Sequence, residues 1–319
     1  MKPSRILIVG GSGFLGRHLT ARLAAQNRRI IVPSRRAERA RHILMLPTAR
    51  LVDLAAPDAP SLESLVADSD AVVNLVGILH GSWGDPYGPE FAQAHVELPR
   101  RLADACAKTG VRRLVHVSAL GVSDDPAVPG PSMYLRSKAD GERAIRAAEG
   151  VDWTILRPSV VFGPEDSFLN VFAKLQRYFP VIPLARTEAR FQPVFVGDVA
   201  QAIVNALDTP ATIGRTYELA GPEVFTLREL VELAGRWSGH PRPVWPLGYT
   251  LGQLQAGVLG AMPRPMMSMD NFDSMSVDNV ASGPIAPELN IVPTPLASVA
   301  PNYLPQRIRY NEERAHARR

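Results

Sequence analysis

The sequence contains a glycine-rich segment at residues 10–16, Gly10-Gly11-Ser12-Gly13-Phe14-Leu15-Gly16. It follows an apolar run at residues 5–9 and opens residues 14–25, where apolar side chains recur at helical spacing. A strand, a tight glycine turn and a helix in this order are the context in which such a stretch binds a diphosphate, because the helix N-terminus attracts anions. We expect the backbone at Gly13 to approach the diphosphate and Gly16 to bring the helix close to the strand.

The alternation of strand and helix continues through the first half of the chain. Buried-strand patterns lie at residues 29–33, 50–54, 71–75, 113–117 and 153–157, and helical patterns lie at residues 61–66, 90–108 and 134–148. Such alternation indicates parallel strands joined by right-handed crossovers, and the continuous Ile, Leu and Val runs indicate strands covered on both faces. The sequence therefore predicts an α/β protein with a Rossmann-type, doubly wound parallel sheet.

The pattern changes after about residue 164, where proline becomes more frequent and clear strands become fewer. Asp198 predicts an N-cap for a helix over residues 199–207, and Thr226-Leu227-Arg228-Glu229 predicts a capping box at the start of another helix. We expect residues 1–164 to form the Rossmann-type domain that binds the diphosphate ligand, with a strand at residues 153–158 closing the sheet. Residues 165–319 are expected to form a smaller C-terminal lobe, from which some segments return to the Rossmann core.

The end of the second strand bears on the choice of cofactor. NAD-selective domains carry an acidic residue about twenty positions after the glycine turn, whereas this chain has Ser34-Arg35-Arg36 there. A hydroxyl and two guanidinium groups suit the 2′-phosphate of NADP. We therefore expect NADP(H) to be preferred over NAD(H). The alternative is a basic surface loop, since Arg39 and Arg41 continue the run.

The ends of the third and fourth strands are expected to line the same ligand, because ligands of parallel sheets bind beyond the carboxyl ends of the strands. Asp53 and Leu54 close the third strand near the expected adenine position, although Asp53 could equally cap a loop. The residues predicted to bind the cofactor on these grounds are Gly10, Ser12, Gly13, Phe14, Leu15, Gly16, Ser34, Arg35, Arg36, Asp53, Leu54, Leu75, Val76, Gly77 and Val117.

A tyrosine and a lysine lie one helical turn apart in Tyr134-Leu135-Arg136-Ser137-Lys138, so both side chains belong to one helix face. An ammonium near a phenol favours tyrosinate, and Lys138 could also bind ribose hydroxyls of the cofactor. Ser118 follows the fifth strand, where its hydroxyl could bind a substrate carbonyl or alcohol. We therefore expect Tyr134, Lys138 and Ser118 to be the catalytic residues, with Tyr134 and Lys138 also contacting the cofactor.

With these motifs the chain resembles the extended form of the short-chain dehydrogenase/reductase superfamily. The matching residues also include Asp53-Leu54 and the run from Leu156-Arg157-Pro158 to Gly163-Pro164, and the resemblance covers most of the chain. In that superfamily the segment after Pro158 lies by the nicotinamide, which adds Pro158 and Val161 to the expected cofactor-binding residues. Phe195-Val196-Gly197-Asp198 resembles the segment that begins a helix near the substrate lobe.

More narrowly, residues 10–19, 74–79, 134–138 and 191–196 resemble an atypical branch of the superfamily. That branch contains the nucleotide-binding alpha-subcomplex accessory subunit of respiratory complex I and its bacterial relatives, and it is associated with bound NADPH. The mitochondrial member serves mainly in assembly and stability. The resemblance therefore implies a bound cofactor without implying turnover.

Two histidines leave alternatives open. Extended members of the superfamily usually have an Asn that holds a water in the proton relay, whereas this chain offers His95 at that place. His95 could substitute in the relay or be a partly exposed helix residue. His80 could reach the substrate cleft or be a plain loop residue.

Composition excludes several other classes of protein. Cys106 is the only cysteine and is expected to be a buried apolar residue, so no disulfide framework or thiolate metal site is predicted, and no histidine pair has metal spacing. The net charge of +4 comes without a nucleic-acid motif, so no nucleic-acid partner is expected. The basic tail at residues 307–319 is expected to be a solvated terminus, with an acidic or anionic lipid partner as the alternative.

The amino terminus lacks the pattern of a signal peptide, which predicts a cytoplasmic protein. The uncharged residues 244–262 are expected to form a core or interface helix, with membrane contact as the alternative and with Pro246 and several glycines against a span.

Three functions fit the sequence. The first is an NADP(H)-dependent oxidoreductase or epimerase-like enzyme acting on a small carbonyl or alcohol substrate. The second is a non-catalytic NADP(H)-bound accessory or assembly subunit of a respiratory NADH:quinone oxidoreductase, peripheral to the inner membrane face. The third is an NADP(H)-sensing regulator.

Overall fold

The computed structural model describes residues 2–54, 59–262 and 267–305. The chain divides into two compact units. The first unit comprises Met1–Pro158, Val196–Leu219 and Ser282–Val292, and the second comprises Ser159–Phe195, Ala220–Ala281 and Pro293–Arg319. Two segments from the second half of the chain therefore belong to the first unit. The expectation for the basic tail at residues 307–319 lies outside the described residues.

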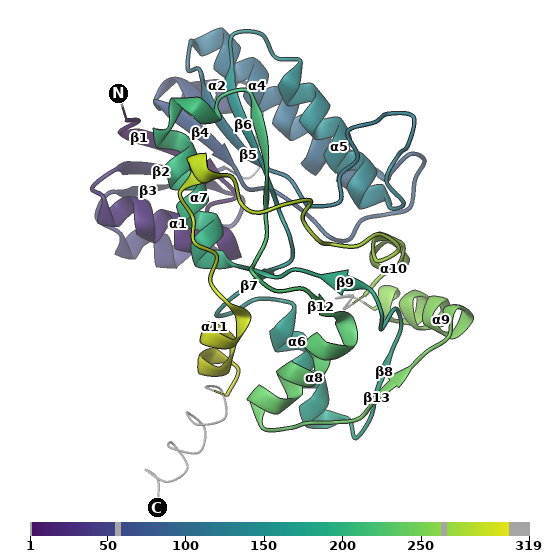
Figure 1. The fold of residues 1–319 in the computed structure, drawn as a ribbon. Helices are drawn as coiled ribbons and strands as arrows, with labels where there is room; N and C mark the ends of the chain where they lie inside the picture. The colour runs from purple at the N-terminus through teal and green to yellow at the C-terminus, as the bar shows by residue number, and fades with distance from the viewer. Residues whose placement is uncertain (1, 55–58, 263–266, 306–319) are drawn as a thin grey trace, which may run out of the picture. The chain divides into compact units, whose positions relative to one another are not determined.

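The first unit is built on a seven-stranded sheet in the order β11-β6-β5-β4-β1-β2-β3 (Figure 1). Every neighbouring pair is parallel. The chain order reverses between β1 and β4, and ligands of Rossmann-type folds bind at this switch point. The predicted fold class is confirmed. The strands are β1 (Arg5–Val9), β2 (Arg29–Ser34), β3 (Ala49–Asp53), β4 (Ala71–Asn74), β5 (Arg113–Val117), β6 (Asp152–Pro158) and β11 (Arg215–Leu219).

Helices cover both faces of this sheet (Figure 1). On one face, α2 (Ala59–Ala67), α4 (Leu98–Thr109) and α5 (Met133–Arg146) pack on the sheet through a buried apolar cluster that includes Leu7, Val72 and Leu114. Cys106 belongs to this cluster, as predicted, and burial raises the pKa of its thiol to about 12. On the other face α1 (Phe14–Ala25) packs against α7 (Val196–Asp208), which the second half of the chain supplies.

The start of α7 corrects one prediction. Asp198 was expected to cap a helix over residues 199–207, but α7 begins at Val196, directly after β10 (Val194–Phe195). Asp198 therefore lies within the first helical turn. A carboxylate there still stabilises the helix through its positive end, so the residue type suits either place and does not fix the boundary.

The second unit consists of helices and short two-stranded ladders. Its elements are β7 (Val161–Phe162) with β10, β9 (Arg190–Phe191) with β12 (Phe225–Thr226), β8 (Ile182–Leu184) with β13 (Val244–Pro246), α6 (Leu169–Tyr178), α8 (Leu227–Ser238), α9 (Tyr249–Gly260), α10 (Met269–Ser274) and α11 (Leu296–Tyr303). Thr226 and Glu229 form the predicted capping box of α8, each side chain bonding the other residue's backbone amide.

The uncharged residues 244–262 do not form one continuous helix. They begin with β13, turn at Gly248 and continue as α9. Among residues 2–54, 59–262 and 267–305, no helix is both long and apolar enough to span a bilayer.

A close backbone approach at Gly16 joins α1 to the turn after β1. A Cβ atom at Gly16 would overlap the carbonyl group of Gly11, and backbone atoms cannot move aside as a flexible side chain can. Gly10, at φ +86°, makes the turn itself in a region that L-residues rarely adopt. The geometry of the turn thus requires glycine at positions 10 and 16.

We predict that Gly16→Ala lowers the free energy of unfolding by at least about 2 kcal/mol, because overpacking forces the backbone to shift. Gly257→Ala in α9 is the matched control, since a Cβ there meets no atom within 4 Å. That control should be neutral or slightly stabilising through helix propensity. Urea unfolding followed by circular dichroism measures both variants, and equal stability of the two would contradict the prediction.

Candidate functional site

The N-terminus of α1 is open to an anion. Gly13 is its N-cap and no side chain caps the helix, and the first turn contains no acidic residue. The first amides of a helix have no intrahelical acceptor, so they need a partner from outside the helix. Among the described residues, a Cβ atom at Gly13 would have one neighbouring atom within 4 Å, the carbonyl oxygen of Gly10, at a distance of 3.3 Å. The turn therefore has the uncovered amides and the open backbone that a diphosphate needs.

Strands β2 and β3 end side by side next to this turn. Ser34 pairs in register with Asp53, and the amide of Leu54 donates to the carbonyl oxygen of Ser34 at 3.0 Å. Ser34 is buried, and its hydroxyl accepts the amide of Arg36 at 3.3 Å. The side chains of Arg35 and Arg36 are exposed. At this edge the acidic residue, Asp53, thus ends β3. Strand β2 ends instead at Ser34, and Arg35 and Arg36 follow it.

Lys138 of α5 ties the ends of β4 and β5 together. Its ammonium Nζ donates to the carbonyl oxygen of Val117 at 3.2 Å and to that of Val76 at 3.4 Å. Lys138 is only 3% exposed, and burial lowers the pKa of its ammonium to about 8, against the attraction of the Glu142 carboxylate. A Cβ at Gly77 would lie 3.3 Å from Nζ, so this loop passes directly over the cation.

Ser118 follows β5 immediately and is buried, with 4% of its surface exposed. Within the described part of the chain its hydroxyl oxygen has no hydrogen-bond partner. Its amide donates to the carbonyl oxygen of Leu156 at 2.7 Å, which fixes the backbone. Because an unpaired buried hydroxyl is costly, this position is suited to a ligand oxygen.

Tyr134 and Lys138 lie on one face of α5, as their spacing requires. The helix begins at Met133, and its N-cap is Ser132, whose side chain accepts a hydrogen bond from the amide of Leu135. The Tyr134 ring is half-buried and packs edge-on against His95, with ring centroids 5.4 Å apart. The phenol of the candidate catalytic pair therefore lies beside the histidine that replaces the superfamily's usual Asn.

His95 is a buried residue held at both ring nitrogens, which corrects the expectation that it is partly exposed. The amide of Ile78 donates to Nε2 at 3.0 Å, so this nitrogen carries no proton. The other nitrogen, Nδ1, must then be the donor to the hydroxyl of Ser137 at 2.8 Å, and that hydroxyl donates to the carbonyl oxygen of Tyr134. His95 is fully buried, and burial with the Lys138 ammonium lowers its pKa to about 2. It is therefore a neutral residue at neutral pH, and its part in a proton relay stays a prediction.

The helix expected over residues 90–108 contains a wide turn that places His95. The segment runs as α3 (Pro89–Phe91), a π-helical turn at Ala92–Glu97 and then α4. Pro99 lies four residues after His95. Because proline has no N–H and its ring clashes with the carbonyl four residues earlier, the carbonyl oxygen of His95 cannot accept the regular α-helical hydrogen bond. This carbonyl instead faces Gly141 of α5, where a Cβ would overlap it. The helical segment predicted for residues 90–108 is thus present, but the sequence pattern did not predict its π-helical turn.

A second polar pair lies under the same edge and was not singled out from the sequence. Asn74 and His116, both fully buried, occupy register positions on β4 and β5 and bond to each other at 3.1 Å. The side-chain Oδ1 of Asn74 accepts a hydrogen bond from the backbone amide of Val76 at 3.1 Å. The signal was two polar residues at matching positions of neighbouring apolar strands. Burial lowers the pKa of His116 well below its usual value.

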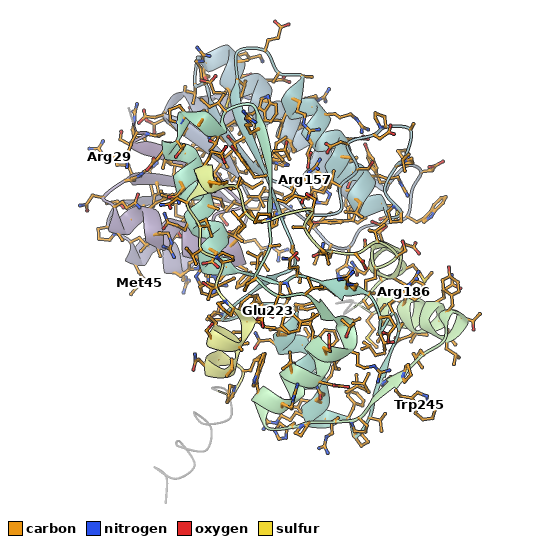
Figure 2. All side chains as sticks on the ribbon, viewed as in Figure 1. Arg29, Met45, Arg157, Arg186, Glu223 and Trp245 are labelled. Atoms are coloured by element: carbon orange, nitrogen blue, oxygen red, sulfur yellow. The ribbon has the colours of Figure 1, made fainter. Side chains whose placement is uncertain are left out.

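An ion network supports α5 from the sheet. Arg157 of β6 donates to the carboxylates of Glu142 and Asp124 at 2.6–2.9 Å, and Figure 2 shows Arg157 within the ribbon of the first unit. Burial alone would lower the pKa of the Arg157 guanidinium, but these hydrogen bonds outweigh it and raise the pKa. Glu142, one turn after Lys138, is fully buried, so the network fixes the helix that bears Tyr134 and Lys138.

The remaining predicted residues do not all lie in one unit. Pro158 ends β6, where its carbonyl oxygen accepts the amide of Leu120 at 2.9 Å, whereas Val161 belongs to the second unit. His80 is half-buried in the loop after β4. In the ranges the structure describes, no three His, Cys, Asp or Glu side chains are placed to hold a metal ion.

The fold and this edge define a Rossmann-type protein of the extended short-chain dehydrogenase/reductase class. The sequence pattern of the NAD dependent epimerase/dehydratase family matches residues 6–220, so the chain belongs to that family.

The proteins to which this chain is similar differ in activity. Over 293 residues the chain is 32% identical to NADH dehydrogenase [ubiquinone] 1 alpha subcomplex subunit 9, mitochondrial, of Arabidopsis thaliana, covering 86% of this chain and 70% of that protein. It is 29% identical to (4-alkanoyl-5-oxo-2,5-dihydrofuran-3-yl)methyl phosphate reductase of Streptomyces griseus, covering 82% of this chain and 83% of the reductase. A solved UDP-glucuronic acid 4-epimerase of Bacillus cereus with bound NAD shares the fold, with a TM-score of 0.71 at 17% identity, covering 94% and 96% of the two chains.

The buried neutral histidines predict a pH dependence of stability. The pKa of His95 is about 2 in the folded protein and about 6.5 when unfolded, so below pH 6.5 only the unfolded chain takes up this proton. Its contribution to stability is complete above pH 6.5 and falls by about 1.4 kcal/mol per pH unit below it, down to about pH 2. His116 adds a drop of the same sign.

We predict that His95→Gln, which can keep an acceptor for Ile78, reduces the slope of unfolding free energy against pH between 6.5 and 5 by about 1.4 kcal/mol per unit. Urea unfolding of both proteins at several pH values measures the slope. An unchanged slope would show that His95 takes up a proton in the folded protein.

Proposed function

We propose that the first unit binds NADP(H) in preference to NAD(H), with the diphosphate at the uncovered amides of α1. Arg35 and Arg36 would bind the 2′-phosphate beside the Ser34 hydroxyl. Two features support this assignment: β2 ends without a carboxylate, and both guanidinium groups are exposed to an incoming ligand. Lys138 would bind the nicotinamide ribose through one N–H donor of its ammonium. The other two N–H donors already bond the carbonyl oxygens of Val76 and Val117.

The proposed activity is that of an NADP(H)-dependent oxidoreductase or epimerase-like enzyme on a small carbonyl or alcohol substrate. The observation that carries it is the buried hydroxyl of Ser118, which lacks a partner among the described residues. Ser118 would donate to the substrate oxygen, and Tyr134 would give or take a proton at its phenol oxygen. The ammonium of Lys138 favours the tyrosinate form. The nicotinamide, when bound, supplies or accepts the hydride.

A second candidate is a non-catalytic accessory subunit of a respiratory NADH:quinone oxidoreductase, in which bound NADP(H) stabilises the fold. It is favoured by the similarity to the Arabidopsis thaliana subunit and by His95, which is held neutral where a proton relay would pass. Such a protein would be cytoplasmic and peripheral to the inner membrane face. A sensor of the NADP(H) redox state uses the same cofactor site and requires different affinities for the two cofactor forms.

The cofactor assignment predicts a selective loss. Changing Arg35 and Arg36 together to Ala should weaken NADPH binding at least about tenfold, since a hydrogen bond to a charged group contributes roughly 1.5–3 kcal/mol. NADH binding should change little. Arg29→Ala is the control, because Arg29 is an exposed arginine at the opposite end of the same strand (Figure 2). Isothermal titration decides, and tighter binding of NAD(H) by the unaltered protein would refute the preference.

The oxidoreductase assignment predicts turnover that depends on Tyr134. NADPH oxidation with a panel of ketones, quinones and nucleotide sugars should reveal a substrate, and Tyr134→Phe should lower kcat by about 100-fold or more without changing the Kd of the cofactor. Tyr217→Phe, at a buried tyrosine of β11, is the matched control. If the protein binds NADPH but turns over nothing in the panel, and Tyr134→Phe retains the cellular phenotype, the accessory function replaces the enzymatic one.

A further inference from the structure

Helix α9 in the second unit packs through its smallest residues. Gly252 and Ala256 are buried against Ala185 and Phe272. A Cβ at Gly252 would lie 2.8 Å from the Cβ of Ala185 and 2.9 Å from the Phe272 ring, so the helix lies very close to its support. The buried side of α9 is therefore its small-residue side.

The large apolar side chains of α9 face away from that support. Leu251, Leu254 and Val258, at spacings of three and four, form one helix face and are 56%, 64% and 58% exposed. An amphipathic surface helix of a globular protein normally turns such side chains to the core and polar ones to solvent. Here the exposed side is the more apolar one, which is typical of a helix with a partner outside its own unit.

Neighbouring elements extend this exposed surface. Trp245 of β13 pairs in register with Pro183 of β8, and Gln255 of α9 donates to the carbonyl oxygen of Pro183 at 2.8 Å, so all three elements meet there. Trp245 is 67% exposed and points away from its strand (Figure 2). Tyr178 and Phe179, just before β8, are also exposed. We call this surface the apolar face; its residues are Tyr178, Phe179, Trp245, Leu251, Leu254 and Val258.

The two chain segments that form the apolar face are bounded by positive charges, and the nearby carboxylates of Asp270 and Asp273 belong to α10, which packs on the small-residue side of α9. Residues 178–185 and 243–262 contain no charged residue, and the charged residues that immediately bound them in the described chain are Arg177, Arg186 and Arg242. Arg177 and Arg186 lie over aromatic rings of the same region, at 6.0 Å from Tyr178 and 5.4 Å from Tyr249. Aromatic and aliphatic side chains bordered by arginines are complementary to a surface with an apolar interior and negative headgroups.

We propose that the apolar face is an interfacial binding site for an anionic phospholipid bilayer. Leu251, Leu254 and Val258 enter the acyl boundary, Trp245 lies at the headgroup level, and the bordering arginines bind lipid phosphates. A protein partner that covered this surface would need acidic groups opposite Arg177 and Arg242 and an apolar centre, and a bilayer offers both without specific side chains. The proposal does not depend on whether the first unit turns over a substrate.

Vesicle flotation of the full chain tests the proposal. The protein should float with vesicles of phosphatidylcholine mixed with phosphatidylglycerol, and binding should weaken with added salt and with phosphatidylcholine alone. Leu254→Asp should reduce the bound fraction at least about tenfold. The substitution removes an apolar side chain that would enter the bilayer and adds a negative charge that the anionic lipids repel. Val292→Asp is the matched control: Val292 is an 89% exposed apolar residue of the first unit.

Arg177→Gln should reduce binding to the mixed vesicles and leave binding to phosphatidylcholine unchanged. Near-ultraviolet circular dichroism and cofactor titration verify that each variant is folded. Equal flotation of Leu254→Asp and Val292→Asp would overturn the proposal. It would also be overturned if sedimentation equilibrium showed a dimer that Leu254→Asp dissociates, because the face would then bind a second copy.

Discussion

A buried positive charge organises the carboxyl edge of the sheet. The ammonium of Lys138 is almost fully removed from water, which is unfavourable unless nearby groups replace its hydration. The carbonyl oxygens of Val117, at the end of β5, and of Val76, in the loop after β4, do so, and Glu142 supplies the opposite charge one turn further along α5. Satisfying this one charge therefore fixes the helix, both strand ends and the loop at Gly77 together.

The fold could be predicted from sequence because its signals are local. The expected strands at residues 5–9 and 113–117 and the helix at residues 14–25 have the observed bounds, since apolar runs, glycine turns and helical spacing each act over a few residues. The sequence predicted that some segments after residue 164 return to the Rossmann core, but it did not indicate that residues 196–219, which supply α7 and β11, are among them. That return is decided by packing between segments far apart in the chain, which periodicity does not encode.

The candidate site was predictable residue by residue but not as a hydrogen-bond network. The spacing of Tyr134 and Lys138 implies a shared helix face, whereas the state of His95 depends on Ile78 and Ser137, which come from two other elements. A ring nitrogen is donor or acceptor according to its partner, so no pattern around His95 could give its tautomer. The wide turn that buries this histidine likewise arises from the combination of Pro99 and Gly141.

The two main proposals differ in the route of a proton rather than in how the cofactor binds. A fixed, neutral His95 positions the loop after β4 and the start of α5 equally well in an enzyme and in a structural subunit. A proton leaving Tyr134 would need another acceptor within reach, since both nitrogens of His95 are occupied. Lys138, with a pKa of about 8, changes charge close to neutral pH and lies on the same helix face. The proposed oxidoreductase activity would therefore require Lys138 to exchange its proton with solvent or ligand, a requirement that cofactor binding alone does not impose.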